Sequence, residues 1–259
     1  METGSLVINN DLRKCCRMVS NGGTFQAFMA KMANSTAYQR GNTNEFSPDR
    51  VEYDPTSPLS GKKIAFLGSS VTYGFAAHGV SFVDYLQVRD GVITTKSAVS
   101  GTTLAGNAPD GYLARLQRDF DPTANYDLFV CQLSTNDNQH GKKLGQVTES
   151  DQRDQFDQET TLGAIETICA TIQKRFHCPL VFYTCLQDDP NHDYQTLINE
   201  LRNLTSKWDF GIIDLFDNHG LRSSLAAHPN AMFDDVHPTQ EGYLKVWLPF
   251  FEQQLPKFI

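Results

Sequence analysis

The chain has 259 residues, with 22 Lys or Arg and 30 Asp or Glu, so its formal net charge at pH 7 is −8. Hydrophobic residues make up 40% and charged residues 20%, which is typical of soluble globular proteins and excludes the disordered class. The acidic balance argues against a nucleic-acid partner and against an anionic membrane surface, because both require a basic face.

The start of the chain and its cysteines favour a cytoplasmic location. Residues 1–7 lack the basic and apolar regions of a secretory signal, and no run of 18 apolar residues predicts a membrane-spanning helix. None of the six cysteines forms a Cys-x-x-Cys pair, and Cys131 lies in an apolar run. We therefore expect buried free thiols in a reducing compartment, and no catalytic cysteine.

The first sixty residues show little regular pattern and no repeat. One helix is predicted from Thr24 to Ala33, where large apolar side chains recur at near-helical spacing. Ser47 to Leu59 contains three prolines, which favour an extended lead-in over a helix. We expect residues 1–60 to form an N-terminal extension of unknown role, followed by a domain over residues 61–259.

From residue 61 onward, short apolar runs come between helical patterns. Continuous apolar runs are typical of strands buried on both faces of a parallel sheet. The predicted strands are Ile64–Leu67, Ile93–Val99, Leu128–Cys131, Leu180–Tyr183 and Gly211–Leu215. Apolar residues mark one helical face over 162–176 and again over 194–204. This alternation predicts an α/β fold with helices on both faces of the sheet and chemistry at the carboxyl ends of its strands.

The first predicted strand ends in a turn that can present a nucleophile. Ser69 and Ser70 follow Gly68, and a helix starting there would direct its partial positive charge at a developing anion. Five residues separate Gly68 from Gly74, and Phe75 follows. A phosphate-binding P-loop has four residues between its glycines and then Lys, so a P-loop is excluded. A plain helix cap is the remaining alternative from these residues alone.

Two more polar segments carry candidate chemistry. Asn136 follows the third predicted strand, where its amide could stabilise an oxyanion at the same sheet edge as Ser70; a simple turn is the alternative. Asp234 stands three positions before His237, so its carboxylate could orient the imidazole of a general base. Metal binding and a capping aspartate are the alternatives for this pair.

Together these segments resemble the SGNH family of hydrolases, also called GDSL-type esterases. The four blocks of the family correspond to residues 68–72 (Gly-Ser-Ser-Val-Thr), 99–103 (Val-Ser-Gly-Thr-Thr), 134–137 (Ser-Thr-Asn-Asp) and 234–237 (Asp-Asp-Val-His). The resemblance covers residues 61–258 in the family's block order. It implies a three-layer α/β/α, flavodoxin-like fold with a parallel sheet.

The resemblance also implies a mechanism, in which carboxylic esters of small or medium acyl groups are cleaved through an acyl-serine intermediate. Ser70 would be the nucleophile, His237 its general base and Asp234 the residue that holds the imidazole. The backbone N–H groups of Ser70 and Gly101, with the amide of Asn136, would form the oxyanion hole. No metal and no organic cofactor is implied. The expected partner is a small-molecule ester, without nucleic acid or membrane.

Two positions depart from the family's blocks. Ser69 stands where the first block has Asp, which leaves two adjacent serines, and Ser134 stands where the third block begins with Gly. Neither replacement removes a catalytic group.

Residues 138–153 are polar and are expected to form a loop over the site. The cluster at 188–193 is interpreted as a loop that caps the next helix, with a metal site as the alternative.

Other functions remain open from the sequence. A carbohydrate O-deacetylase would use the same chemistry and differ only in the alcohol of its ester. A non-catalytic SGNH-like binding domain would be marked by loss of a triad group, but all three groups are present. Flavin or nucleotide binding on the same scaffold is a weaker alternative, because a fold alone does not confer a function.

Overall fold

The computed structural model describes residues 25–259, where five parallel strands form one sheet in the order β2-β1-β3-β4-β5. The strands are β1 (Lys63–Gly68), β2 (Ile93–Ala98), β3 (Leu128–Gln132), β4 (Leu180–Tyr183) and β5 (Gly211–Ile213). All five predicted strands are confirmed, and the order is the flavodoxin-like one.

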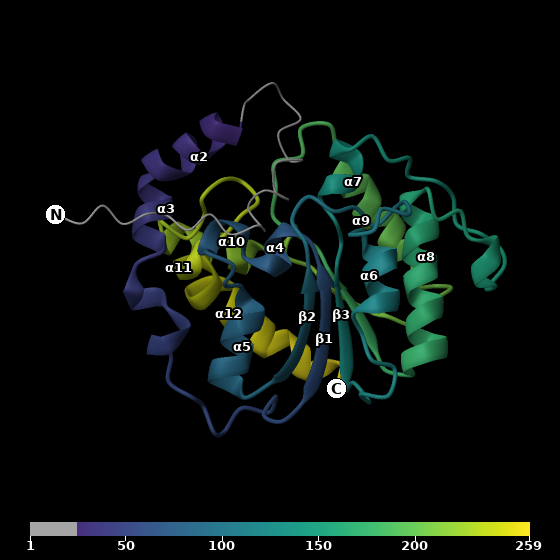
Figure 1. The fold of residues 1–259 in the computed structure, drawn as a ribbon, viewed down its shortest axis with the longest axis horizontal. Coiled ribbons are helices and arrows are strands. Elements are labelled where there is room, and N and C mark those ends of the chain that lie inside the picture. The colour runs from purple at the N-terminus through teal and green to yellow at the C-terminus, as the bar shows by residue number, and fades with distance from the viewer. Residues whose placement is uncertain (1–24) are drawn as a thin grey trace.

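Helices cover both faces of this sheet, so the fold has three layers (Figure 1). One face carries α5 (Phe82–Asp90) and α12 (Leu248–Gln254), with α10 (His219–Ala227) and the short α11 (Gln240–Gly242) nearby. The other carries α6 (Tyr112–Arg118), α8 (Thr161–Thr171) and α9 (Asp193–Leu204). The helices predicted over 162–176 and 194–204 are therefore confirmed, the first ending in a π-helical turn, Ile172–Phe176.

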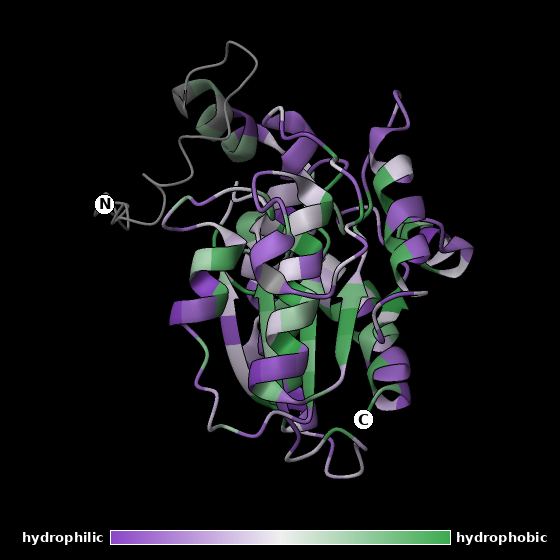
Figure 2. Ribbon diagram, turned by 90° about the vertical axis from the view of Figure 1, so that its right-hand side faces the viewer, coloured by the Kyte–Doolittle hydropathy of each residue, from purple (hydrophilic) through white to green (hydrophobic). Residues whose placement is uncertain are grey.

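The hydrophobic core lies in and around the central strands (Figure 2). Apart from Lys63, every residue of β1, β3 and β4 is buried, because each of these strands has a neighbour on both sides and a helix layer on each face. The edge strand β2 reads Ile-Thr-Thr-Lys-Ser-Ala and is mostly half-buried. Continuous apolar character is thus confined to the interior strands, as expected for a parallel sheet.

The order of the strands locates the functional edge of the sheet. The chain passes from β1 to β2 on one side and then returns to β3 on the other side of β1. Since such crossovers are right-handed, the connecting helices after this reversal cover the opposite face. The carboxyl ends of β1 and β3 form the switch point where doubly wound sheets bind their ligands. Ser70 and Asn136 follow these two strand ends.

In the described part of the chain, two α-helices precede the sheet, namely α2 (Phe25–Asn34) and α3 (Thr36–Gly41). The predicted helix over residues 24–33 is confirmed from residue 25 onward; Thr24 lies outside the described residues. The extended lead-in predicted over 47–59 is wrong at its start, where Pro48–Arg50 form a 3₁₀ turn. The fixed φ of Pro48 suits a first helical position, and Ser47 Oγ accepts a hydrogen bond from the N–H of Asp49.

The polar stretch 138–153 is mainly a loop, as predicted. It follows the short helix α7 (Asn136–Gln139) and runs to the 3₁₀ turn Arg153–Gln155. A buried ion pair holds its far end: Glu166 accepts a hydrogen bond from the N–H of Thr148 at 2.9 Å and pairs with Lys207. Lys207 in turn donates to the carbonyl of Ser150 at 2.6 Å. The loop is therefore tied to the helical layer.

Four cysteines lie in the described part of the chain, and all four are free thiols. Cys131, Cys169 and Cys185 are buried and Cys178 is half-buried, whereas Cys15 and Cys16 lie outside the described residues. Burial raises the pKa of the Cys178 thiol to about 11. Since the thiolate is the reactive form, burial makes such thiols poor nucleophiles.

Within residues 25–259, no helix has the length and apolar character needed to cross a bilayer.

A pair of carboxyl groups makes the stability of the fold pH-dependent. Burial is the main cause that raises the pKa of Glu252 from 4.5 to about 7, and the charge of the neighbouring Asp90 carboxyl is the second. The positive charge of Arg89 opposes this rise. Protonated Glu252 therefore favours the folded state. This stabilisation is complete below about pH 4.5 and is lost as the pH rises through about 7.

We expect the free energy of unfolding to fall between these pH values more steeply in the wild type than in Glu252→Gln, whose amide does not titrate. Urea unfolding curves at half-unit pH steps measure this difference. Parallel pH profiles for the two proteins would contradict it.

Candidate active site

Ser70 begins α4 (Ser70–Tyr73) directly after β1, in a turn that depends on two glycines. A Cβ on Gly68 would lie only 1.7 Å from Thr72 Oγ1. Gly74 has a φ of +90°, and a Cβ there would lie 2.2 Å from the carbonyl oxygen of Val80. Only glycine fits these positions. The turn places the Ser70 side chain, 1% exposed, at the carboxyl edge of the sheet.

Ser70, His237 and Asp234 form a continuous hydrogen-bonded row. His237 Nε2 lies 2.9 Å from Ser70 Oγ, and His237 Nδ1 lies 2.9 Å from each carboxylate oxygen of Asp234. A carboxylate can only accept, so Nδ1 carries the proton and Nε2 can accept from the Ser70 hydroxyl. This is the geometry in which a histidine can take a proton from serine.

The environment of Asp234 keeps its carboxyl group ionised. Burial alone would raise the pKa of Asp234, but the charge and hydrogen bond of His237 together with the backbone N–H groups of Val236 and His237 outweigh it. Those N–H groups donate to Asp234 Oδ1 at 2.9 and 2.7 Å. The net effect is a pKa below the ordinary value of 3.8, so Asp234 is available as an anion at neutral pH.

The neighbouring hydroxyl of Ser69 has a different partner. Ser69 is fully buried, its Oγ accepts from Gln132 Nε2 at 2.9 Å, and its N–H donates to Gln132 Oε1 at 2.9 Å. The same Gln132 oxygen accepts the backbone N–H and the hydroxyl of Thr72, at 3.1 and 2.8 Å. Of the two serines, Ser70 is thus the one that contacts His237. Gln132 was not among the residues predicted for the site, since it is simply the last residue of β3.

Asn136 is the first residue of α7, and its side chain reaches the loop that carries Gly101. Asn136 Nδ2 donates to the carbonyl of Thr102 at 2.9 Å, which uses one of its two N–H groups. The Asn136 backbone N–H donates to Ser134 Oγ at 3.0 Å. The serine that replaces the family's glycine therefore supports the start of α7. Gly101 itself has a φ of +75°, a conformation that glycine adopts without strain.

Asp137 holds the loop after Gly101 in place through hydrogen bonds. Its two carboxylate oxygens accept the backbone N–H groups of Leu104 and Ala105, each at 2.9 Å, and Thr161 donates to it at 3.2 Å. Burial raises the pKa of Asp137 above its ordinary value although these hydrogen bonds oppose the rise. Sequence reasoning placed Asp137 in the third block without a role of its own. Its position directly after Asn136, within the same block, was the signal available in the sequence.

Arg115 of α6 is a second residue that sequence reasoning missed. It is 1% exposed and donates from Nη2 to the carbonyl of Gly68 at 2.8 Å and to Thr102 Oγ1 at 3.2 Å. Its Nη1 donates to the carbonyl of Ser97, at the end of β2, at 2.6 Å. Burial lowers the pKa of Arg115 below its ordinary value. The side chain therefore holds three segments at the sheet edge together.

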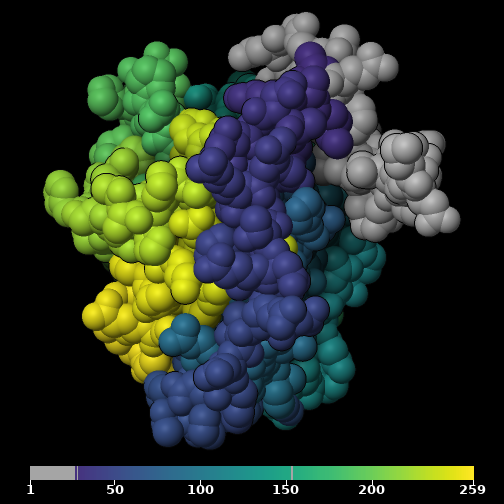
Figure 3. Space-filling model, turned by 90° about the vertical axis from the view of Figure 1, so that its left-hand side faces the viewer, coloured from purple at the N-terminus to yellow at the C-terminus, as the bar shows by residue number. Residues whose placement is uncertain are grey.

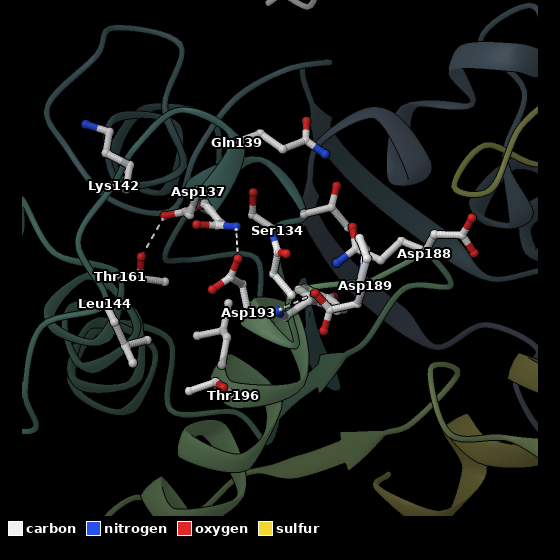
Figure 4. Close-up of a pocket in the computed structure, with 17 residues that line it drawn as sticks. Ser134, Asp137, Gln139, Lys142, Leu144, Thr161, Asp188, Asp189, Asp193 and Thr196 are labelled. Carbon is white, nitrogen blue, oxygen red and sulfur yellow. Dashed lines mark hydrogen bonds between the residues drawn. The ribbon is translucent and has the colours of Figure 1, made fainter.

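Two cavities border the site near Asn136. One of about 580 Å³ is lined by Val99–Thr103, Ala108–Gly111, His140 and Lys142. Another of about 220 Å³ is lined mainly by polar residue types: Asp188 and Asp189 lie on one side of it, opposite Lys142 and Leu144 (Figure 4). The N–H of Asp188 donates to Asp235 Oδ2 at 3.2 Å, so the rim of this smaller cavity contacts the His237 loop.

The cluster at 188–193 caps a helix, as predicted. Asp189 accepts the N–H groups of Tyr194 and Gln195, at 3.1 and 2.8 Å, at the start of α9. Asp193 accepts from Asn138 Nδ2 at 2.9 Å. Among residues 25–259 no group of three or more His, Cys, Asp or Glu side chains is arranged to hold a metal ion.

The doubly wound sheet and the Ser–His–Asp row at its carboxyl edge have the geometry of a serine hydrolase. The model of the GDSL-like lipase/acylhydrolase family matches residues 66–245. The chain belongs to this family, which confirms the resemblance seen in the sequence and makes it a hydrolase of the SGNH type. A search of curated proteins found no match.

Several solved structures share the fold. A protein from Lactobacillus plantarum has a TM-score of 0.63 and 19% identity, covering 78% of this chain and 99% of its own. A protein described as a GDSL-like lipase from Bacteroides uniformis has a TM-score of 0.53 and 15% identity, covering 75% and 96%. A family two carbohydrate esterase from Clostridium thermocellum, solved with cellohexaose, has a TM-score of 0.50 and 13% identity, covering 76% and 65%. At these identities the likeness concerns the fold.

Proposed function

We propose that this acylhydrolase cleaves carboxylic esters of small or medium acyl groups through an acyl-serine intermediate on Ser70. The observation that carries the proposal is the row of 2.9 Å contacts from Ser70 Oγ through His237 to Asp234. It connects a hydroxyl at the start of a helix to a base whose far nitrogen is held by a half-buried, ionised carboxylate.

The reaction then proceeds in two halves. His237 Nε2 takes the proton of Ser70 as its oxygen attacks the ester carbonyl carbon, and Asp234 stabilises the imidazolium that forms. His237 gives this proton to the departing alcohol, which leaves the acyl group on Ser70. Water, deprotonated by His237, attacks the acyl carbon; the proton returns to Ser70 and the carboxylic acid is released.

The negative charge on the carbonyl oxygen needs donors in each half. In this proposal they are the backbone N–H groups of Ser70 and Gly101 and the second N–H of the Asn136 amide. The support lies in the contacts that hold these groups: Arg115 bonds the carbonyl of Gly68 and the hydroxyl of Thr102, and Asn136 bonds the carbonyl of Thr102. Donors fixed before reaction need no reorganisation when the charge develops.

The smaller cavity favours a second candidate, a carbohydrate O-deacetylase. Its lining is rich in carboxylates and amides, which suit the hydroxyl groups of a sugar: Asn138, Gln139, Gln187, Asp188, Asp189, Asn191 and Asp193. The larger cavity is within the size range of small-molecule sites and could hold an acyl group of moderate length. Both candidates use the same serine chemistry.

The test combines an inhibitor pair with a substrate panel. We expect hydrolysis of p-nitrophenyl acetate to survive dialysis against EDTA and to be abolished by a fluorophosphonate, since the reaction proceeds on serine. Loss on dialysis that zinc or manganese restores would overturn the serine mechanism. Rates on p-nitrophenyl esters of graded chain length are then compared with rates on acetylated sugars.

A cavity variant separates the two candidates. If the alcohol is a sugar bound in the smaller cavity, Gln139→Ala should raise KM for the acetylated sugar and leave p-nitrophenyl acetate unaffected. An equal effect on both substrates, or none, favours the simple ester.

A further inference from the structure

Part of the chain N-terminal to the family match packs beside the candidate site. It comprises α2, α3 and the residues up to Phe46, all N-terminal to residue 66, where the match begins. Figure 3 shows it as a purple strip between the yellow-green C-terminal residues and the blue residues that follow β1. It therefore lies where the Ser70 turn and the His237 loop come together.

Asn42, at the end of α3, bonds to both of these segments. Its Nδ2 donates to the carbonyl of Ala76 at 2.9 Å, in the 3₁₀ turn Phe75–Ala77 that follows α4. Its Oδ1 accepts the N–H of Gln240 at 3.0 Å, three residues after His237. The other N–H of the amide donates to the carbonyl of Tyr38 at 2.8 Å, which fixes the rotamer. One amide thus uses both of its ends to join two distant parts of the chain.

The preceding residue, Gly41, packs closely against the loop that contains His237. A Cβ on Gly41 would lie 2.3 Å from the carbonyl oxygen of Asn230 and 2.4 Å from Thr239 Oγ1, so only glycine allows this approach. Thr239 Oγ1 in turn donates to the carbonyl of Asn230 at 2.6 Å. The end of α3 therefore contacts both ends of the stretch that contains Asp234 and His237.

An apolar cluster next to His237 joins the same three segments. Met32 from α2, Phe75 and Ala76 from the turn after α4, and Phe233 from the His237 loop pack together, apart from the main core. The ring of Phe75 lies 5.0 Å from the imidazole of His237, and the ring of Tyr38 lies 5.8 Å from that of Phe233. The N-terminal segment therefore packs against Phe75, whose ring contacts the imidazole of His237.

We propose that Asn42 is a positioning residue, which holds the Ser70 turn and the His237 loop in the register that the serine reaction needs. This inference rests on the proposed function. Besides the Ser70–His237 contact and the apolar cluster, hydrogen bonds from Tyr243 to the carbonyl of Val71 at 2.6 Å and from Gln240 Nε2 to that of Ala77 at 3.4 Å also link these segments. Loss of Asn42 should therefore displace the two segments slightly without separating them.

The test compares Asn42→Ala with Asn44→Ala, an exposed asparagine two residues further on. We expect Asn42→Ala to lower kcat for p-nitrophenyl acetate roughly 10- to 100-fold, the scale for a small misplacement of reacting groups, with KM nearly unchanged. The rate of fluorophosphonate labelling should fall by the same factor. Asn44→Ala should match the wild type in both.

Asn42→Asp gives a second comparison that keeps size and the acceptor for Gln240, but turns an oxygen toward the carbonyl of Ala76. It should also lower kcat, even if Asn42→Ala does not yield folded protein. A folded Asn42 variant with a lower Tm but wild-type kcat and labelling rate would overturn the positioning role and leave the proposed function intact. A wild type that hydrolyses esters yet resists fluorophosphonate would overturn both.

Discussion

Replacing Ser70 with Ala should lower kcat by a factor on the order of 10⁶, the scale for loss of a serine that acts together with its histidine. The reason is that Ser70 Oγ is the hydroxyl 2.9 Å from His237 Nε2. Without this oxygen no acyl-enzyme forms, and the base has no proton to take. Steady-state hydrolysis of p-nitrophenyl acetate measures the loss, with far-UV circular dichroism to show that the variant is folded.

Ser69→Ala is the matched control, because it removes the adjacent hydroxyl. Ser69 Oγ accepts from Gln132 in the interior, so its loss leaves a buried donor without a partner. Such a loss costs roughly 1–3 kcal/mol of folding free energy. We expect Ser69→Ala to reduce stability and to cost far less in kcat than Ser70→Ala. A larger loss of kcat in Ser69→Ala would reverse the assignment.

Replacing Asn136 with Ala should lower kcat by roughly 10²–10³, with little change in KM. The amide would meet a charge that develops mainly in the transition state, so its removal affects the reaction more than binding. Part of the effect should come from the lost bond to Thr102, which holds the loop of Gly101.

Ser134→Gly is the control for Asn136→Ala. It removes the hydroxyl that accepts the Asn136 N–H and restores the glycine of the family's block. It leaves the Asn136 amide in place, so kcat should change only a few-fold. Unaltered kcat with a raised KM in Asn136→Ala would instead assign this residue to ground-state binding.

Much of the fold could be predicted because parallel sheets leave a strong local signal. The interior strands β1, β3 and β4 are buried on both faces and therefore read as continuous apolar runs. The signal weakens at the edge, where β2 is half-buried and contains Lys96. The lead-in over 47–59 failed locally, because Pro48 is compatible with the first position of a 3₁₀ turn as well as with extended chain.

The residues of the candidate site that belong to the family's blocks could be predicted from the sequence. The residues that support them through long-range contacts could not. Ser70, Gly101, Asn136, Asp234 and His237 stand in short motifs at the ends of predicted elements, and the structure brings Ser70, His237 and Asp234 into contact. Their roles stay predictions.

The supporting residues have no such motif. Gln132, Arg115 and Asn42 act on partners 63, 47 and 198 positions away, and no local periodicity encodes such pairings. The choice of Ser70 over Ser69, by contrast, came from its position in the first block, and it is Ser70 Oγ that lies 2.9 Å from His237 Nε2.

The central claim is that ester cleavage passes through a covalent bond to Ser70. It is tested most directly by treating the wild-type protein with a fluorophosphonate and mapping the adduct by peptide mass spectrometry. We predict one adduct, on Ser70, and none in His237→Ala, since the serine is then no longer deprotonated. An adduct on Ser69, or a protein that hydrolyses esters but forms no adduct on Ser70, would contradict the account.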